Sequence, residues 1–188
     1  TTNVKDFVKD YVMKENEKEE YVWQTCFGPG IWRIMAALIG IHGDDKGLVL
    51  PFDIVPIQII IVPVLFSDKD NKKIVKTCKE IEKKLKNNYR IKFDDTEASP
   101  GYKYNYWELR GVPIRLEIGP KEIKEDKVTL SLRTNSKNKI SIKIKYLIKE
   151  IEKSAILIDK KIEEKALLYF KDKTRETNSY NELKKIIK

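Results

Sequence analysis

The 188-residue chain is poor in the residue types on which disulfide frameworks and zinc sites depend. It holds two cysteines, Cys26 and Cys78, and one histidine, His42. Because the cysteines lie far apart and show no pairing pattern, we expect free thiols in a reducing compartment. Two cysteines and a lone histidine without ligand spacing form no zinc motif, so we predict no metal site within the chain.

Long uninterrupted apolar runs are missing as well. The apolar stretch 54–66 has 13 residues and is interrupted by Pro56, Gln58 and Pro63. A helix that crosses a membrane needs about 20 apolar residues, and the N-terminus has no signal-peptide pattern. We therefore expect a cytoplasmic protein with no membrane contact.

Charge of both signs is abundant, with a surplus of positive charge. Lysine and arginine number 38 against 29 aspartates and glutamates, a formal net charge of +9. Residues 134–188 hold 15 basic and 8 acidic residues, and so carry most of the surplus. A basic chain favours an anionic partner such as RNA. A lysine-rich, solvated helix surface explains the same composition, so composition leaves both readings open.

The hydrophobic pattern predicts two regions of different type. In the first we expect two strands, 10–14 and 19–25, and then a buried helix over 33–42. Residues 51–56 carry two prolines and are interpreted as a linker. The apolar run and amphipathic stretches beyond it indicate an α/β fold, a mixed open sheet with flanking helices. There we expect strands at 58–65, 89–93, 114–118 and 128–132, and helices at 69–88, 101–110, 140–173 and from 180 onward.

A glycine-flanked arginine is the first candidate site. Residues 28–33 read G-P-G-I-W-R and lead into the apolar run 34–41. Glycines allow close backbone approach to a ligand, and an arginine at a helix start can hold a phosphate. By itself the pattern also fits an arginine paired on a surface helix. With the continuation HGDDKGLVLPFDIVPIQIIIVPV, however, the segment resembles motif 3 of class II aminoacyl-tRNA synthetases, and among them the prolyl-tRNA synthetases of the archaeal and eukaryotic-like type.

This resemblance implies part of an ATP site. Arg33 would be the catalytic residue that contacts the ATP phosphates while proline is activated, with Mg²⁺ accompanying the ATP. The ATP and aminoacyl site would also include Gln24, Thr25, Gly28 and Gly30. Many members of the family have Ser or Thr two residues before the arginine, whereas this chain has Ile31.

A second candidate site combines aromatic and basic residues over 101–115. Such mixtures suit single-stranded RNA, whose bases stack on rings, although helical spacing predicts that Tyr104 and Trp107 serve the core. Residues 107–121, with the sequence WELRGVPIRLEIGPK, resemble the anticodon-binding domain of prolyl-tRNA synthetases. The resemblance implies that Glu108 and Arg115 read the guanines of the proline anticodon. Two further basic residues are expected to contact the RNA: Arg133 and Lys137.

Other polar groups receive no chemical role. His42, Asp44 and Asp45 could form an acid–base or metal cluster, but the adjoining glycines favour a turn whose acids satisfy backbone or Lys46. The acids at 94 and 95 are read as turn residues. Cys78 falls on an apolar helix stripe and is expected in the core.

The resemblance predicts three parts and a function. Residues 1–53 would end a class II catalytic domain, 54–140 would form an anticodon-binding α/β domain, and 141–188 a long helix and the start of a truncated C-terminal region. The chain would belong to a proline–tRNA ligase that uses ATP, proline and proline tRNA and forms a homodimer through its catalytic domain. Class II motifs 1 and 2 are absent, so the chain alone is expected to be inactive. Alternatives are a stand-alone tRNA-anticodon-binding module and a sister class II enzyme such as a threonyl- or histidyl-tRNA synthetase.

Overall fold

The structure is a computed structural model that describes residues 12–15, 18–21, 27–65 and 68–187. The chain divides between Arg33 and Ile34 into two compact units. The first unit contains an antiparallel hairpin of β1 (Val12–Glu15) and β2 (Lys18–Tyr21). The hairpin confirms the two expected strands, of which residues 10–11 and 22–25 lie outside the described residues. The predicted division at residue 53 stays a prediction.

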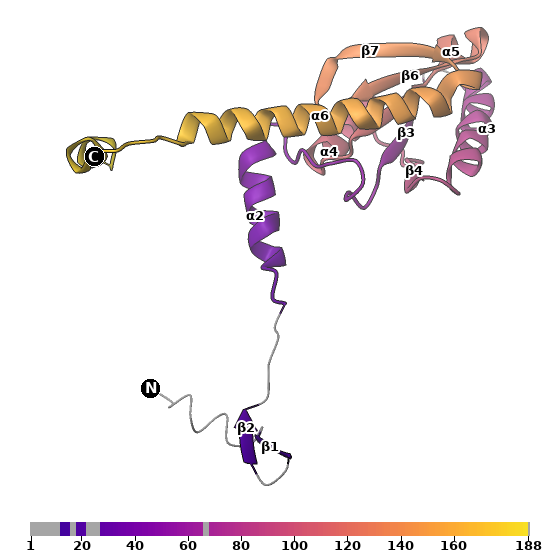
Figure 1. The fold of residues 1–188 in the computed structure, drawn as a ribbon. Helices are drawn as coiled ribbons and strands as arrows, with labels where there is room; N and C mark the ends of the chain where they lie inside the picture. The colour runs from indigo at the N-terminus through magenta and orange to yellow at the C-terminus, as the bar shows by residue number, and fades with distance from the viewer. Residues whose placement is uncertain (1–11, 16–17, 22–26, 66–67, 188) are drawn as a thin grey trace. The chain divides into compact units, whose positions relative to one another are not determined.

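A five-stranded mixed sheet forms the centre of the second unit (Figure 1). Its spatial order is β4-β3-β5-β6-β7, in which β3 runs parallel to β4 and β5 and the last three strands are antiparallel. The strands are β3 (Ile59–Pro63), β4 (Ile91–Phe93), β5 (Ile114–Ile118), β6 (Lys127–Leu132) and β7 (Asn135–Lys143). This architecture confirms the predicted mixed open sheet.

Helices cover both faces because the two parallel crossovers run in opposite directions across the sheet. Helix α3 (Asp68–Leu85) connects β3 to β4, and α4 (Pro100–Leu109) leads from β4 back past β3 to β5. Right-handed crossovers of opposite direction place their helices on opposite faces. Strand β3 is therefore apolar throughout: Ile59 and Ile61 join the α3 core, and Ile60 and Val62 join that of α4.

The long helix begins later than the sequence pattern predicts. Residues 140–143 belong to β7, a short 3₁₀ turn follows at Ile144–Tyr146, and α6 spans Leu147–Lys173. The prediction of helix over 140–146 is wrong, because alternating isoleucines there pair with β6, as in Val128 opposite Ile142. Helix α6 then packs Leu147, Ile151 and Ile158 against the sheet. Two short helices complete the fold, α5 (Pro120–Glu125), which the sequence analysis missed, and α7 (Tyr180–Ile187).

Helix α2 (Ile31–His42) is less buried than expected. Only His42, at its C-terminal end, is buried, whereas Trp32 and Ile34 are exposed. The prediction of a buried helix is therefore wrong for this chain, because only the last turn of α2 packs against other described residues. Among the described residues, no helix combines the length and apolar character required to cross a membrane.

A tight turn connects α2 to the rest of the second unit. Asp44 and Gly47 exchange two backbone hydrogen bonds of 3.1 and 2.9 Å, and Leu48 N–H donates to the carbonyl of Leu109 at 3.1 Å. The guanidinium of Arg133, which follows β6, donates to both carboxylate oxygens of Asp44 and to the carbonyl of Gly47. The turn is thus fixed on the end of α4 and on β6.

Gly47 is required by this geometry. Its φ of +123° is left-handed, and an added Cβ would lie 2.5 Å from the backbone of Leu109. We expect Gly47→Ala to lower the free energy of unfolding by about 1–3 kcal/mol or more from strain and displacement. Gly101→Ala is the matched control, since a Cβ there meets nothing within 4 Å. Urea unfolding followed by circular dichroism measures both; equal stabilities would contradict the close approach.

The Asp44–Arg133 pair predicts a pH dependence of stability. Hydrogen bonding from Arg133, against opposing burial, lowers the pKa of Asp44 from its ordinary 3.8. The ionised carboxylate therefore stabilises the fold above about pH 4, and this contribution is lost as the pH falls through the lower folded-state pKa. We expect Asp44→Asn to be less stable than the native chain at about pH 7, by less than the ~3–5 kcal/mol of a fully buried pair, because the Asp44 side chain is 44% exposed.

The stability difference between the native chain and Asp44→Asn should shrink in urea unfolding at about pH 3. The exposed neighbour Asp45 provides the matched control, Asp45→Asn. A difference that stays constant with pH would show that the carboxylate charge does not hold Arg133.

Candidate nucleic-acid interface

Helix α4 carries the aromatic and acidic residues of the candidate interface. Its first turn is capped by Ser99, whose hydroxyl accepts from Tyr102 N–H at 3.4 Å, and Pro100 occupies the first turn. It ends before Gly111, whose φ of +71° lets the chain turn sharply into β5. These end signals place Glu108 in the last turn of the helix, beside the start of β5.

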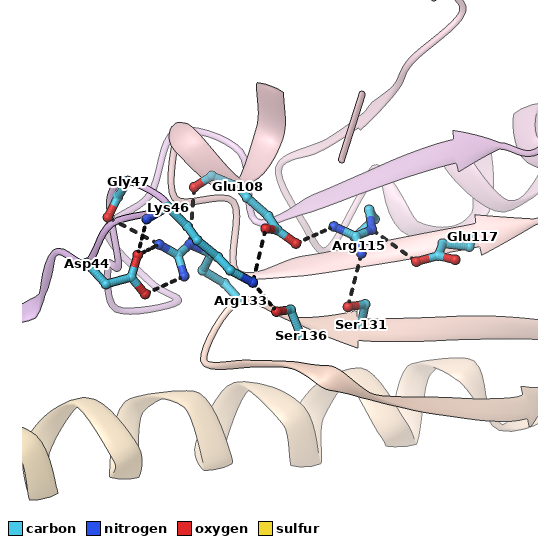
Figure 2. A network of polar contacts seen from close by, with 9 residues as sticks. All are labelled: Asp44, Lys46, Gly47, Glu108, Arg115, Glu117, Ser131, Arg133 and Ser136. Carbon is cyan, nitrogen blue, oxygen red and sulfur yellow. Dashed lines mark hydrogen bonds and ion pairs between the residues drawn. The ribbon is translucent and has the colours of Figure 1, made fainter. Parts of the chain in front are cut away.

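Glu108 and Arg115 form the central ion pair (Figure 2). Arg115 Nη1 donates to Glu108 Oε1 at 2.9 Å, and both side chains are largely buried. Arg115 Nε also donates to Glu117 Oε1 at 3.1 Å, and its Nη2 donates to Ser131 Oγ at 3.3 Å. Three neighbouring groups therefore fix the plane of the guanidinium.

The ring of Tyr104 packs against the same guanidinium, 4.0 Å from its Cζ. Burial, with the nearby Glu117 carboxylate, raises the pKa of Tyr104, so its hydroxyl stays protonated at neutral pH. The sequence analysis expected Tyr104 in the core, and the structure finds it half-buried against the α4 cluster. Its role is to hold Arg115 from one side.

Arg133 lies beside this pair but directs its donors elsewhere. Its Nε donates to the backbone carbonyl of Glu108 at 3.1 Å, and its terminal nitrogens bind Asp44 and Gly47. The side chain is only 3% exposed. This geometry favours a structural role, in which Arg133 joins the turn after α2 to the end of α4, over direct contact with a phosphate.

Two lysines complete the cluster. Lys46 Nζ lies 3.8 Å from Glu108 Oε2 and donates to Ser136 Oγ at 3.0 Å. Lys139 Nζ donates to Glu117 Oε2 at 2.6 Å. Neither lysine was expected at the interface from the sequence. No local signal marks them, because both reach the site only when distant segments meet in the fold.

A second polar cluster lies around Asp94, which contacts α4 through Lys103 and Trp107. Trp107 Nε1 donates to Asp94 Oδ2 at 2.6 Å, and the ammonium of Lys103 lies 3.5 Å from Oδ1. Burial alone would raise the pKa of Asp94, but hydrogen bonds from Thr96 and Trp107 lower it overall. Asp94 is therefore a buried structural carboxylate that holds Trp107 and also accepts from the backbone N–H of Thr96.

An aromatic surface lies next to this cluster. Tyr102 is exposed and stacks on Tyr106 with a centroid separation of 6.1 Å, and the guanidinium of Arg110 covers Tyr106 at 3.4 Å. A cavity of about 260 Å³ opens between these tyrosines and Lys92. Exposed rings beside cations are the groups on which unpaired bases stack.

The other predicted site residues are placed as follows. Arg33 is exposed in the first turn of α2, close after the exposed Gly28 and Gly30. Gln24 and Thr25 lie outside the described residues. The backbone of residue 137 lies in β7, and its side chain is not described. In the described part of the chain, no three His, Cys, Asp or Glu side chains gather to hold a metal ion.

The arrangement suits recognition rather than proton transfer. Each carboxylate of the central cluster is paired with a cation, and the Glu108–Arg115 pair presents an acceptor beside a donor. Glu108 Oε2 has only the longer contact to Lys46, whereas Oε1 is held closely by Arg115. One carboxylate oxygen is therefore available to an incoming hydrogen-bond donor.

Comparison with known proteins agrees with this geometry. A relative from Thermofilum pendens named proline–tRNA ligase is 42% identical over 86% of this chain and 34% of its own length. Relatives of the same name from Thermoplasma acidophilum and Methanococcus vannielii are 43% and 42% identical, over 89% and 80% of this chain and 36% and 32% of their own lengths. The chain thus spans about a third of the length of the curated relatives it matches, and the resemblance to prolyl-tRNA synthetases is confirmed.

The family described as "Anticodon binding domain" matches residues 58–154, more than half of the chain. The matched range includes the sheet from β3 to β7, helix α4 and the Glu108–Arg115 pair. The chain therefore belongs to the family of anticodon-binding domains.

Proposed function

We propose that this chain is the anticodon-recognising part of a proline–tRNA ligase and also supplies one segment of its ATP site. The observation that carries the proposal is the Glu108–Arg115 pair, held at the end of α4 inside the matched domain. The relatives' names support proline as the amino acid. The whole protein would activate proline with ATP and transfer it to proline tRNA.

Guanine fits the polar groups of the pair. Its Watson–Crick edge offers two kinds of N–H donor for a carboxylate, and its O6 and N7 accept from an arginine. Glu108 Oε2 can accept the guanine donors by exchanging its 3.8 Å contact with Lys46, while Arg115 keeps Oε1 in place. Arg115 then positions Glu108, and its remaining N–H groups would donate to the guanine acceptors.

The aromatic surface supports a single-stranded partner. The exposed Tyr102 stacks on the half-buried Tyr106 of the same helix as Glu108, and Arg110, which follows this helix, covers the Tyr106 ring. An anticodon loop presents unpaired bases that stack on such rings. Lys137 would add a basic contact from β7, whereas Arg133 acts by holding the Asp44 turn and the end of α4.

The ATP segment is proposed because the sequence resembles motif 3 and because Arg33 is exposed. Arg33 stands free of buried packing in the first turn of α2, so its guanidinium can reach a phosphate, with Gly28 and Gly30 allowing close approach. Gln24 and Thr25 would line the same site. ATP with Mg²⁺ is the proposed substrate, and a cytoplasmic homodimer the proposed setting of the whole ligase.

A stand-alone tRNA-binding module is the second candidate. The unit from Ile34 onward has its own core on both faces of the sheet, which an independent module requires. In such a module Arg33 would have no ligand. Catalysis by a protein that includes this chain separates the two candidates, because only the ligase would lose activity when Arg33 is replaced.

Replacing Glu108 tests the proposed base reading. Glu108→Gln keeps the side-chain shape but turns one acceptor oxygen into a donor that opposes guanine N–H groups. We expect it to weaken binding to proline tRNA by about 1–3 kcal/mol. Binding is measured at two salt concentrations, beside the same tRNA with both anticodon guanines changed. The exposed Glu97 gives the matched control, Glu97→Gln.

The changed tRNA should be bound equally by the native chain and Glu108→Gln. An equal loss on both tRNAs would reduce Glu108 to a structural residue or to general electrostatics. Thermal unfolding of each variant ensures that the comparison is made on folded protein, since Glu108 also neutralises the buried Arg115.

The 188-residue chain alone is expected to bind tRNA without activating proline. Its ATP-site segment supplies one phosphate-binding arginine, and class II motifs 1 and 2 do not occur in the sequence. Proline-dependent exchange of pyrophosphate into ATP measures activation directly. Exchange above the rate of an Arg33→Ala control would overturn this expectation.

A further inference from the structure

A small polar cavity lies on the α6 side of the Asp44 turn. Its volume is about 160 Å³, and its polar wall consists of His42, Asp44, Thr134, Lys161 and Lys165. These residues come from the end of α2, the turn after it, the β6–β7 connection and the middle of α6. The cavity is separate from Glu108 and Arg115, neither of which lines it.

Two polar atoms of this wall are buried without a hydrogen-bond partner among the described residues. They are Nδ1 of His42, a side chain that is 5% exposed, and Oγ1 of Thr134. Buried polar groups are nearly always paired, because an unpaired one loses its hydration without replacement. Two such atoms lining one cavity indicate an occupant that can hydrogen-bond to both.

The charges of the wall favour an anion. Lys161 and Lys165 contribute two ammonium groups, while the carboxylate of Asp44 is held by the Arg133 guanidinium. Lys165 also donates to the carbonyl of His42 at 3.1 Å, which fixes its position. Burial and the charge of Lys165 lower the pKa of His42, so its neutral ring keeps one N–H donor. The wall therefore presents ammonium groups and a ring N–H as donors, together with a positive charge.

We propose that this cavity binds a phosphate group, held by Lys161, Lys165, His42 and the hydroxyl of Thr134. A tetrahedral oxyanion has enough acceptor oxygens for all four groups. The volume would hold about five waters at ~30 Å³ each, or one phosphate group with fewer waters. A second, more open hollow that also includes His42 is lined by two acids, Asp159 and Glu163, and one lysine, Lys160, and this net negative charge disfavours an anion there. This site does not depend on the proposed base reading.

Thr134→Val is the sharpest test, because it changes neither charge nor shape. Inorganic phosphate is titrated into the whole 188-residue chain at constant ionic strength, and binding is followed by calorimetry. We expect the valine variant to bind phosphate at least about five-fold more weakly. In phosphate-free buffer it should melt at the same or a higher temperature than the native chain, since it loses an unpaired buried hydroxyl.

Two lysines of α6 give the matched comparison. Lys161→Ala removes a lysine of the cavity, and Lys171→Ala removes an exposed lysine of the same helix that does not line it. Phosphate affinity should fall with Lys161→Ala and stay unchanged with Lys171→Ala. Native chain that does not bind phosphate, or equal effects of the two substitutions, would overturn the proposal.

Proline tRNA distinguishes the two sources of such a group. If the ligand is a backbone phosphate, Thr134→Val also weakens tRNA binding several-fold at fixed salt. If tRNA binding is unchanged while phosphate binding falls, the site takes a free phosphate or a small phosphorylated molecule. Glu108→Gln should leave phosphate binding unchanged, so failure of the base-reading proposal and failure of this one are told apart.

Discussion

The candidate interface depends on one buried guanidinium, that of Arg133. It binds the carboxylate of Asp44 and the carbonyl of Gly47 in one turn, and the backbone carbonyl of Glu108 at the end of α4. Because a buried cation is costly to leave unpaired, both of these distant segments are held against the residue that follows β6. The position of the last turn of α4, and therefore of Glu108, follows from this constraint.

Two polar regions of different character lie next to the Asp44 turn that Arg133 holds. On the α4 side, Glu108, Arg115 and Glu117 are paired almost completely, so recognition there proceeds by exchanging an existing contact for one to a base. On the α6 side, two buried polar atoms, one each of His42 and Thr134, lack partners within the part of the chain that the structure describes. In the paired cluster a ligand must replace an existing contact, so its shape decides whether it binds. In the unpaired cluster a ligand adds hydrogen bonds without breaking any within the protein.

Local patterns were sufficient for most elements and failed where two patterns overlapped. The stripe of Ile74, Cys78, Ile81 and Leu85 predicted α3, and the apolar run at 58–65 predicted β3, because burial imposes a local period. Residues 140–144 fit both a strand period and the start of the helical repeat, and pairing with β6 decided for the strand. Helix α2 was predicted as buried from its apolar character, yet burial requires a partner surface that periodicity does not specify.

The sequence by itself determined the α/β class, most element positions and, through the motif around Glu108 and Arg115, the candidates for base recognition. Only the tertiary structure decided what those residues contact. The sequence predicts that Arg133 contacts RNA, and the structure shows its guanidinium bound to Asp44, 89 residues away. Lys46 and Lys139, unremarkable in sequence, neutralise the two acids of the interface. The physical reason is that periodicity records how each segment meets the core, while the pairing of charges depends on which distant segments the fold brings together.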